Sequence, residues 1–225
     1  MPKKIIIAID GPAGSGKSTA AKNIAQKLGF TYLDTGAMYR AITFIALRNG
    51  ISDNIPAVIS LAQSIDLKLK FENGITHVFL NNEEVTEQIR TAEVNAKVSE
   101  ISKIPEVREE LVKIQKRLGA EGHVVAEGRD VTTVVFPYAD LKIYLTASID
   151  TRARRRLKEF EEKNIRISFE DVKANLETRD KIDSSREVSP LKKADDAIEY
   201  DNSDVTPEQD FEYLLKKIKQ VLSQK

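Results

Sequence analysis

IIIAIDGPAGSGKS, residues 5–18, contains the strongest structural signal in this chain. The unbroken apolar run from Ile5 to Ile9 is typical of a strand buried on both faces, as in a parallel sheet. The next eight residues, Gly11 to Ser18, match the pattern G-x-x-x-x-G-K-[ST] at every required position. Helical periodicity follows from Lys17 to Leu28, and Gly29 is suited to end that helix. A strand, a glycine-rich turn and a helix in this order predict a phosphate-binding loop.

The residue types of this loop explain the expected chemistry. Glycines let the backbone curl so that its N–H groups face an anion, and the following helix points its N-terminus at the same place. We expect Lys17 to reach the β- and γ-phosphates of a nucleotide and Ser18 to hold Mg²⁺, directly or through water. The residues expected to bind ATP here are Gly11, Pro12, Ala13, Gly14, Ser15, Gly16, Lys17, Ser18 and Thr19. The loop alone does not separate small-molecule kinases from GTPases or ATPase motors.

Outward from the loop, strand and helix patterns alternate. The expected strands are residues 31–33, 123–126, 141–145 and an edge strand at 197–200. The expected helices are residues 36–49, two amphipathic helices on either side of Pro105, residues 150–163, 168 to about 186, and 207–222. This alternation predicts one domain over residues 1–225, built as a doubly wound α/β fold with a parallel sheet.

One stretch breaks the alternation. Leu67, Leu69 and Phe71 alternate with charged residues, and Asn73-Gly74 separates them from a second alternating run. Asn-Gly between two such runs is a strong signal for a β-hairpin. We therefore expect a small antiparallel insertion at about residues 66–90, separate from the parallel sheet.

Composition and charge limit the possible functions. The 225 residues include no cysteine, which excludes disulfides and cysteine-ligated metals. They include two histidines, which disfavours a histidine-based metal site. Lys plus Arg and Asp plus Glu both total 35, a balance that argues against a protein that coats nucleic acid or an anionic membrane. The sequence has no apolar run long enough to span a bilayer and no signal-peptide pattern. We expect a cytoplasmic protein.

Arginines are concentrated in the helix expected after the strand at 141–145. Arg152, Arg155 and Arg156 are spaced i, i+3 and i+4, so they share one helical face. Three cations on one face repel one another unless an anion lies there, and a triphosphate would supply it. Arg155 is therefore added to the expected ATP-binding set. The alternative is a solvated face paired with the glutamates at 159, 161 and 162.

The next helix has an apolar face that turns charged. Phe169, Val172 and Leu176 form an inward stripe, and the same stripe continues through Arg179, Asp183 and Arg186. This predicts a helix whose first half packs and whose second half lines a polar cleft. A helix that leaves the body of the protein and becomes solvated is the alternative.

Glu127-Gly128-Arg129-Asp130 follows the strand at 123–126. Ligands of open α/β sheets gather at the carboxyl ends of strands, so Arg129 is placed to bridge two phosphates and Asp130 to accept from an exocyclic amine. A β-turn with an Arg–Asp pair would also explain the pattern. Thr35 and Arg40 flank the start of the helix at 36–49, where Thr35 could simply be an N-cap. Arg90 and Arg108 have no local signature.

In this order, the motifs resemble bacterial-type cytidylate kinases, a family in the nucleoside monophosphate kinase group of P-loop kinases. The resemblance covers nearly the whole chain. It rests on IDGPAGSGKST, on LDTGAMYRAI from Leu33, and on EQIRTAEV from Glu87. It rests also on EVREELVKIQ from Glu106, AEGRDVTTVVFPYADLKIYLTAS from Ala126, and ETRDKIDSSREVSPL from Glu177. Two departures are Thr35, where many members have Ser, and Glu127, where many have Asp, so the role of Glu127 toward Mg²⁺ stays open.

The resemblance implies a P-loop kinase with a lid at 150–168 and a monophosphate-binding region at 35–120 that carries the β insertion. It implies transfer of the γ-phosphoryl group of ATP, with Mg²⁺, to CMP or dCMP. We expect the protein to be a monomer. The substrate-binding set would be Thr35, Tyr39, Arg40, Arg90, Ser99, Arg108, Arg129, Asp130, Arg179, Asp183 and Arg186. Within it, Ser99, Arg108 and Asp130 would read the cytosine edge.

The phosphate of CMP is already a nucleophile, so no general base is expected. Catalysis by positioning and charge neutralisation would fall to Lys17, Arg129, Arg152, Arg156 and Arg179. Three other functions remain: a P-loop kinase for UMP, shikimate or another acceptor, a GTPase-type switch, and a nucleic-acid-binding protein. A switch is disfavoured because no T-K-x-D or D-x-x-G motif follows a core strand. A nucleic-acid-binding protein is disfavoured because the net charge is neutral.

Overall fold

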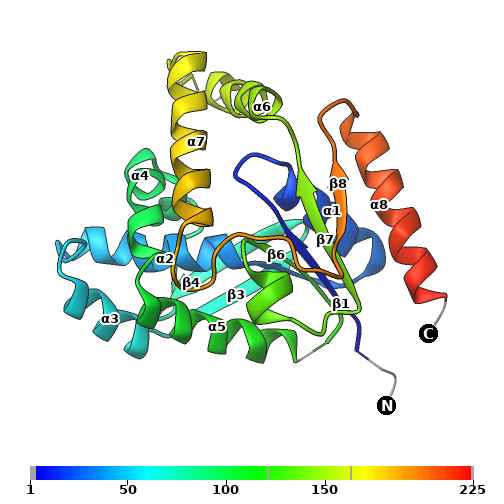
Figure 1. Cartoon of the computed structure of the whole chain (residues 1–225). Helices are drawn as coiled ribbons and strands as arrows, with labels where there is room; N and C mark the ends of the chain where they lie inside the picture. Colours follow the sequence, from blue (N-terminus) through cyan, green and yellow to red (C-terminus); the bar gives the residue numbers. More distant parts are fainter. Residues whose placement is uncertain (1–3, 121, 163, 224–225) are drawn as a thin grey trace.

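A five-stranded parallel sheet lies at the centre of the molecule (Figure 1). The computed structural model describes residues 4–120, 122–162 and 164–223. The strand order is β2-β6-β1-β7-β8, and every neighbouring pair is parallel. The strands are β1 (Ile6–Asp10), β2 (Thr31–Asp34), β6 (Val124–Gly128), β7 (Leu141–Thr146) and β8 (Ile198–Asp201). The expected edge strand is β8, at one side of this sheet.

Side-chain alternation along β1 builds a core on each face of the sheet. Ile7 and Ile9 are buried in a cluster with α1 (Lys17–Leu28) and α8 (Pro207–Leu222). Ala8, which points the other way, is buried in a cluster with α2 (Thr35–Arg48) and α5 (Pro105–Gly119). Helices therefore cover both faces, as expected for a doubly wound fold.

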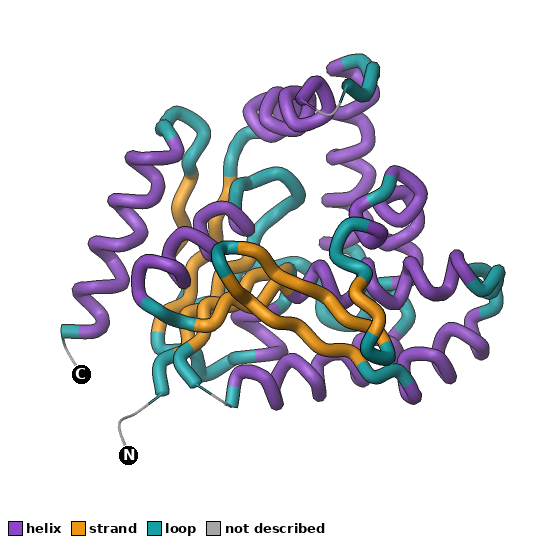
Figure 2. Tube along the Cα trace, turned by 180° about the vertical axis from the view of Figure 1, so that it is seen from behind, coloured by secondary structure: helices purple, strands orange, loops and turns teal. Residues whose placement is uncertain are grey.

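The expected hairpin is confirmed as part of a small second sheet. Its antiparallel strands are β3 (Leu67–Glu72), β4 (Ile75–Leu80) and the short β5 (Glu83–Glu84). Asn73 and Gly74 both have positive φ, at 50° and 74°, as a tight two-residue hairpin turn requires. Figure 2 shows the two long strands running side by side in front of the central sheet.

Besides β5, three elements were not expected from the sequence. Helix α3 (Ile55–Ser64) is capped by Asn54, whose Oδ1 accepts from the N–H of Ala57 at 3.2 Å. Its apolar residues include Ile55, Val58, Ile59 and Ala62, which have the i, i+3, i+4, i+7 spacing of a helical face. A 3₁₀ turn (Gln88–Arg90) precedes α4 (Ala92–Ile101), and a π-helical turn (Val131–Val135) follows β6.

Helices α6 (Ile149–Glu162) and α7 (Phe169–Ser184) pack together over the phosphate loop. Val172 and Leu176 of α7 are buried with Ala153 of α6 and Ala13 of the loop, which confirms the inward stripe. The expected end of the first helix, Lys163, lies outside the described residues. The second helix ends at Ser184, so Arg186 lies just beyond it. No helix in the described part of the chain has the length and apolar character to cross a bilayer.

Candidate active site

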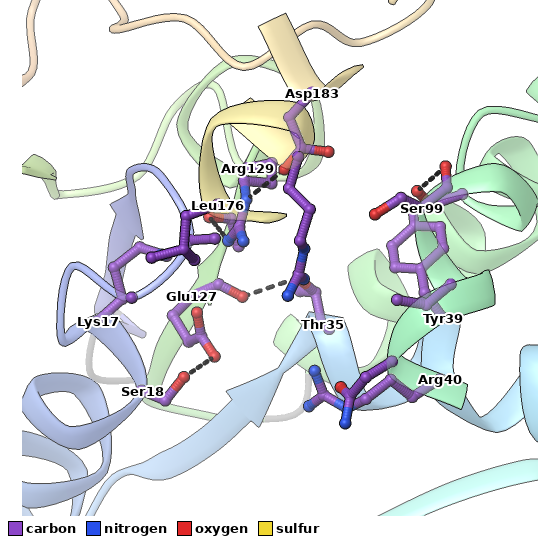
Figure 3. Close-up of a pocket in the computed structure, with 18 of the residues that line it drawn as sticks. Lys17, Ser18, Thr35, Tyr39, Arg40, Ser99, Glu127, Arg129, Leu176 and Asp183 are labelled. Atoms are coloured by element: carbon purple, nitrogen blue, oxygen red, sulfur yellow. Dashed lines mark hydrogen bonds and ion pairs between the residues drawn. The ribbon is translucent and has the colours of Figure 1, made fainter. Parts of the chain in front are cut away.

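A cavity of about 450 Å³ opens at the carboxyl ends of the central strands. Its volume falls within the range of roughly 300–1,000 Å³ that is typical of ligand sites. The lining comes from the phosphate loop, the start of α2, α4, α5, the end of β6, α6 and α7 (Figure 3). The sequence-predicted residues that line it are Ala13, Gly14, Gly16, Lys17, Ser18, Thr19, Thr35, Tyr39, Arg40, Arg90, Ser99, Arg108, Arg129, Asp130, Arg155, Arg156, Arg179, Asp183 and Arg186. Segments far apart in sequence therefore meet at one site.

Steric and backbone requirements of the phosphate loop fit its glycines. A Cβ on Gly11 would lie 1.9 Å from the carbonyl oxygen of Leu145, and Gly14 and Gly16 have φ of 76° and 89°. Lys17 is buried, and its Nζ donates to the carbonyl oxygen of Pro12 at 2.7 Å. Gly11, Pro12 and Ser15, which were also expected to bind ATP, are not among the residues that line the cavity, and their contact with ATP stays a prediction.

Burial lowers the pKa of Lys17 to about 7, and repulsion from Arg129 adds to the shift. The same pattern appears at Arg179, where burial and then Arg129 lower the pKa to about 10. Arg129 thus raises the cost of the charged form at both neighbours, which means that Lys17, Arg129 and Arg179 form one electrostatic cluster. Such a cluster favours an anionic ligand, because an anion near all three would relieve the repulsion.

Ser18 and Glu127 meet beside the loop. Ser18 Oγ donates to Glu127 Oε1 at 2.7 Å, and Tyr32 Oη donates to the same oxygen at 3.3 Å (Figure 3 draws the first contact). Both Ser18 and Glu127 line the cavity. Asp10 is the other buried carboxylate here, but its oxygens accept from Val131 N, Thr132 N and Thr132 Oγ1.

This donor set fits Mg²⁺. Magnesium in kinases is usually held by one or two protein oxygens together with substrate phosphates and water. Ser18 and Glu127 supply a hydroxyl and a carboxylate at the phosphate loop. Among the described residues, no three or more His, Cys, Asp or Glu side chains gather into a metal site, so the nucleotide and water would complete the coordination.

Arg108 and Asp130 form a buried ion pair at the far end of the cavity. Arg108 Nη2 donates to Asp130 Oδ2 at 2.6 Å, and Nη1 donates to the carbonyl oxygen of Ser102 at 3.0 Å. The Arg108 guanidinium lies over the ring of Tyr39, 5.1 Å from its centroid. Burial opposes the charged Arg108, but Tyr39 and Asp130 raise its pKa. Ser99, also at this end, lines the cavity from α4, so donors and acceptors converge where a polar ring edge could dock.

Arg129 and Asp183 connect β6 to α7 across the cavity. Arg129 Nε donates to Asp183 Oδ2 at 2.8 Å, and Arg186 lies 3.6 Å from Asp183 Oδ1. Arg129 and Arg186 lower the pKa of Asp183 against the effect of burial. The sequence-predicted charged half of the stripe thus faces the cavity, although Arg186 does so from beyond the helix end.

Several buried nitrogen donors in this cavity have no protein acceptor. They are Arg40 Nε, Arg108 Nε, Arg179 Nε, and Arg186 Nε and Nη2. A buried N–H without an acceptor is costly, and functional sites are where such donors are retained. The set points to a ligand with several acceptor oxygens, as a nucleoside phosphate has.

At the entrance to α2, two further side chains take part in hydrogen bonds. Thr35 Oγ1 donates to the carbonyl oxygen of Glu127 at 2.7 Å, while the N-cap of α2 is Asp34 rather than Thr35. Arg40 pairs with Asp34 at 3.0 Å. Arg90 is exposed at the rim of the cavity, and within the described residues its side chain forms no hydrogen bond or ion pair.

The three arginines of α6 do not act as one set. Arg152 is buried and donates to Asp180 and to the carbonyl oxygens of Ala13 and Ala147. Arg152 is not among the residues that line the cavity. In this structure Arg152 clamps the loop and Asp180 of α7 satisfies its guanidinium, and the expected catalytic role of Arg152 stays a prediction.

The other two arginines of α6 line the cavity. Arg155 binds Asn202, and Arg156 pairs with Glu159 at 2.6 Å, which is one of the partners that the solvated alternative named.

Sequence reasoning missed Asp10, Asp180 and Asn202. Asp180 also accepts from the N–H of Ala13 at 3.3 Å, so it holds the phosphate loop from α7. Asn202 directly follows β8, and the rule that ligand sites lie at the carboxyl ends of strands could have identified it. Asp10 ends β1 and could have been found by the same rule.

Comparisons with known proteins point to one family. A family model described as cytidylate kinase matches residues 7–220. A cytidylate kinase from Streptococcus agalactiae serotype V (strain ATCC BAA-611 / 2603 V/R) is 48% identical over 223 residues, covering 98% of both chains. One from Streptococcus suis (strain 05ZYH33) is 50% identical over 222 residues, covering 98% of this chain and 99% of the relative.

A solved structure of an uncharacterized protein from Eubacterium ventriosum ATCC 27560 aligns with a TM-score of 0.52 at 13% identity. The alignment covers 97% of this chain and 99% of that one. This likeness concerns the fold alone.

Proposed function

This chain belongs to the cytidylate kinase family, and we propose that its cavity carries out ATP-dependent phosphorylation of CMP, and of dCMP, to the diphosphates. The observation that carries the proposal is the single cavity that joins a phosphate loop at one end to the Arg108–Asp130 pair at the other. The loop suits the triphosphate of ATP, and the buried pair suits the cytosine ring.

Donor and acceptor would bind at opposite ends of the cavity. The loop residues, with Lys17 and Ser18, would hold the triphosphate, and Arg155 would contact ATP from α6. Asp130 would accept from the exocyclic amine of cytosine while Arg108 and Ser99 contact its other polar atoms. The remaining substrate contacts would come from Thr35, Tyr39, Arg40, Arg90, Arg179, Asp183 and Arg186, with the last two on the sugar side.

Transfer would need no general base. A phosphate oxygen of CMP attacks the γ-phosphorus, the bond from that phosphorus to the bridging oxygen breaks, and ADP leaves with the electron pair. Lys17, Arg129 and Arg179 neutralise the charge that develops on the transferred group, and Arg156 adds charge from the lid. Mg²⁺, held by Ser18 and Glu127, would neutralise charge on the β- and γ-phosphates when bound.

The electrostatic cluster supports this division of work. Arg129 lowers the pKa of Lys17 on the loop and of Arg179 on α7, so it lies near both groups. A phosphoryl group in transit would lie near all three cations. Closure of the lid, residues 150–168, and of the monophosphate-binding region, residues 35–120, would exclude water and suppress hydrolysis of ATP.

The setting of the reaction follows from its substrates. ATP and CMP are cytoplasmic metabolites, so we place the enzyme in the cytoplasm. We propose that it acts as a monomer.

The test is ADP formation from Mg²⁺–ATP with CMP, dCMP, UMP, AMP, GMP, shikimate or no acceptor. We expect turnover with CMP and dCMP far above the others. Preferred use of UMP or shikimate would change the acceptor and overturn the role of Asp130. Equal slow hydrolysis with every acceptor would favour a nucleotide switch.

A further inference from the structure

Asn202 is a buried residue in the turn after β8, and its backbone and side-chain polar groups all form hydrogen bonds. Its side chain and backbone are 2% exposed. Its N–H donates to the carbonyl oxygen of Thr146 at 2.9 Å, and its Nδ2 donates to the carbonyl oxygen of Ser15 at 3.0 Å. Its Oδ1 and its carbonyl oxygen both accept from Arg155, at 3.0 and 2.7 Å. One residue therefore joins β7, the phosphate loop and α6.

The two hydrogen bonds between Asn202 and Arg155 lie directly beside the loop. A Cβ on Gly16 would lie 3.5 Å from Asn202 Nδ2 and 3.8 Å from Arg155 Nη1. Arg155 lines the cavity, whereas Asn202 is not among the lining residues. Asn202 is thus placed to act on a bound nucleotide through Arg155 and the loop rather than by contact.

A neutral partner distinguishes Arg155 from its neighbours on α6. Arg152 is paired with the carboxylate of Asp180 and Arg156 with that of Glu159. Among the described residues, Arg155 forms no ion pair with a carboxylate, and its two hydrogen bonds go to an amide and a peptide carbonyl. An amide fixes the plane of a guanidinium without pairing its charge, and the nearby carboxylates of Asp201 and Asp210 interact with the Arg155 charge only beyond ion-pair distance.

We propose that Asn202 is a positioning residue for the donor nucleotide, which holds Arg155 in place beside Gly16 and braces the loop at Ser15. The inference rests on the proposed function, in which Arg155 contacts ATP. Holding a long, flexible side chain in its binding geometry before the ligand arrives lowers the entropy cost of binding. Loss of the brace should weaken binding of ATP and leave binding of CMP unchanged, because Asn202 contacts none of the residues proposed for CMP.

The test compares Asn202→Ala, Arg155→Ala, the double variant and Arg155→Lys in the full chain. The readouts are the Kd for adenylyl imidodiphosphate with Mg²⁺ by calorimetry, and KM for ATP and for CMP separately. Asn175→Ala is the matched control, because Asn175 is exposed on α7. We expect Asn202→Ala and Arg155→Ala each to raise the Kd about tenfold, with no further rise in the double variant. KM for CMP should not change.

Arg155→Lys tests the two hydrogen bonds to Asn202 even if Asn202→Ala fails to fold. Lysine keeps the charge but cannot bind two oxygens of one residue in a plane, so it should lose as much affinity as alanine. Full affinity in Arg155→Lys would overturn the inference, and so would an unchanged Kd in Asn202→Ala. An equal rise of both KM values would also overturn it, since that would indicate general damage. If Arg155→Ala binds the nucleotide normally, the proposed ATP contact of Arg155 fails, which is a separate result.

Discussion

Arg108 and Asp130 form the most deeply buried ion pair of the cavity, with 2% and 5% of their side chains exposed and 2.6 Å between Nη2 and Oδ2. A buried pair of this kind costs desolvation, and removal of one partner leaves a buried charge without compensation. The pair lies where the cytosine ring is proposed to bind. The protein therefore keeps a costly pair at the position where base recognition needs one acceptor and one donor of fixed orientation.

Asp130→Asn tests this pair. The amide keeps the shape but leaves Arg108 without its counter-charge, so the free energy of unfolding should fall by about 3 kcal/mol. The amide can also donate to the O4 carbonyl of uracil, so the ratio of kcat/KM for CMP over UMP should fall. Denaturant unfolding and steady-state kinetics with both acceptors measure the two effects.

Asp196→Asn is the matched control for Asp130→Asn. It removes a carboxylate that pairs with buried Lys142 at 2.8 Å, outside the cavity, and should leave the CMP to UMP ratio unchanged. An Asp130→Asn variant with wild-type selectivity would contradict the proposed contact with the amine.

Arg129→Ala should slow transfer sharply. Arg129 interacts with Lys17, Arg179 and Asp183, so its removal takes away charge where the transferred group passes. Arginines of this type contribute about 10³–10⁵ in rate, which corresponds to about 4–7 kcal/mol. Single-turnover measurements of ADP formation report the chemical step. The exposed Arg154→Ala in α6 is the control and should react at the wild-type rate. A kcat/KM near that of wild type in Arg129→Ala would refute this role.

Local patterns predicted the fold well. These patterns depend on residues that are close together in the chain, so they can be recognised in a single sequence. They are the β-branched run before the loop, the Asn73-Gly74 turn and the apolar spacing of the helices. The same holds for the loop, whose motif fixes the positions of Lys17 and Ser18. Helix α3 was missed although Ile55, Val58, Ile59 and Ala62 have the spacing of a helical face, and the helix is only ten residues long.

Side-chain partners within the site were harder to predict. The partner of Arg152 is Asp180, 28 residues away, and the pair exists only because α6 packs against α7. Asn202 reaches Ser15 across 187 residues because β8 ends beside the phosphate loop. The charge pattern on α6 indicated three arginines on one face, but it contained no information on which carboxylates the other helices would supply.

Glu127 and Ser18 lead to a prediction about Mg²⁺. Glu127→Gln replaces a charged oxygen by a neutral amide, so the free Mg²⁺ concentration at half-maximal velocity should rise about tenfold or more. Direct Mn²⁺ binding in the presence of adenylyl imidodiphosphate, followed by electron paramagnetic resonance, gives a second readout.

Asp10→Asn is the contrasting variant for that metal experiment. Its carboxylate accepts three hydrogen bonds from Val131 and Thr132, and burial raises its pKa to about 6. The Asp10→Asn substitution should lower the melting temperature but leave the Mg²⁺ requirement unchanged. The assignment of Glu127 would be wrong if Asp10→Asn, and not Glu127→Gln, changed the metal dependence.

The depressed pKa of Lys17 predicts proton uptake on binding of the nucleotide. Burial, with repulsion from Arg129, holds the pKa at about 7, so at pH 8 most of the free enzyme carries a neutral Lys17. A triphosphate beside Nζ favours the charged form, so binding at pH 8 should take up close to one proton. Affinity should fall as pH rises above 7, by up to about tenfold per pH unit.

Calorimetry of Mg²⁺–adenylyl imidodiphosphate binding at pH 8, in two buffers with different ionisation enthalpies, measures this uptake. The same pKa has a consequence for folding. Lys17 titrates near 10.5 when unfolded and near 7 when folded, so the unfolded chain holds more protons between these values. Its contribution to the free energy of unfolding should therefore rise with pH across that window, and Lys17→Met should lack this rise. Equal binding enthalpies in both buffers would show that Lys17 is already charged in the free enzyme.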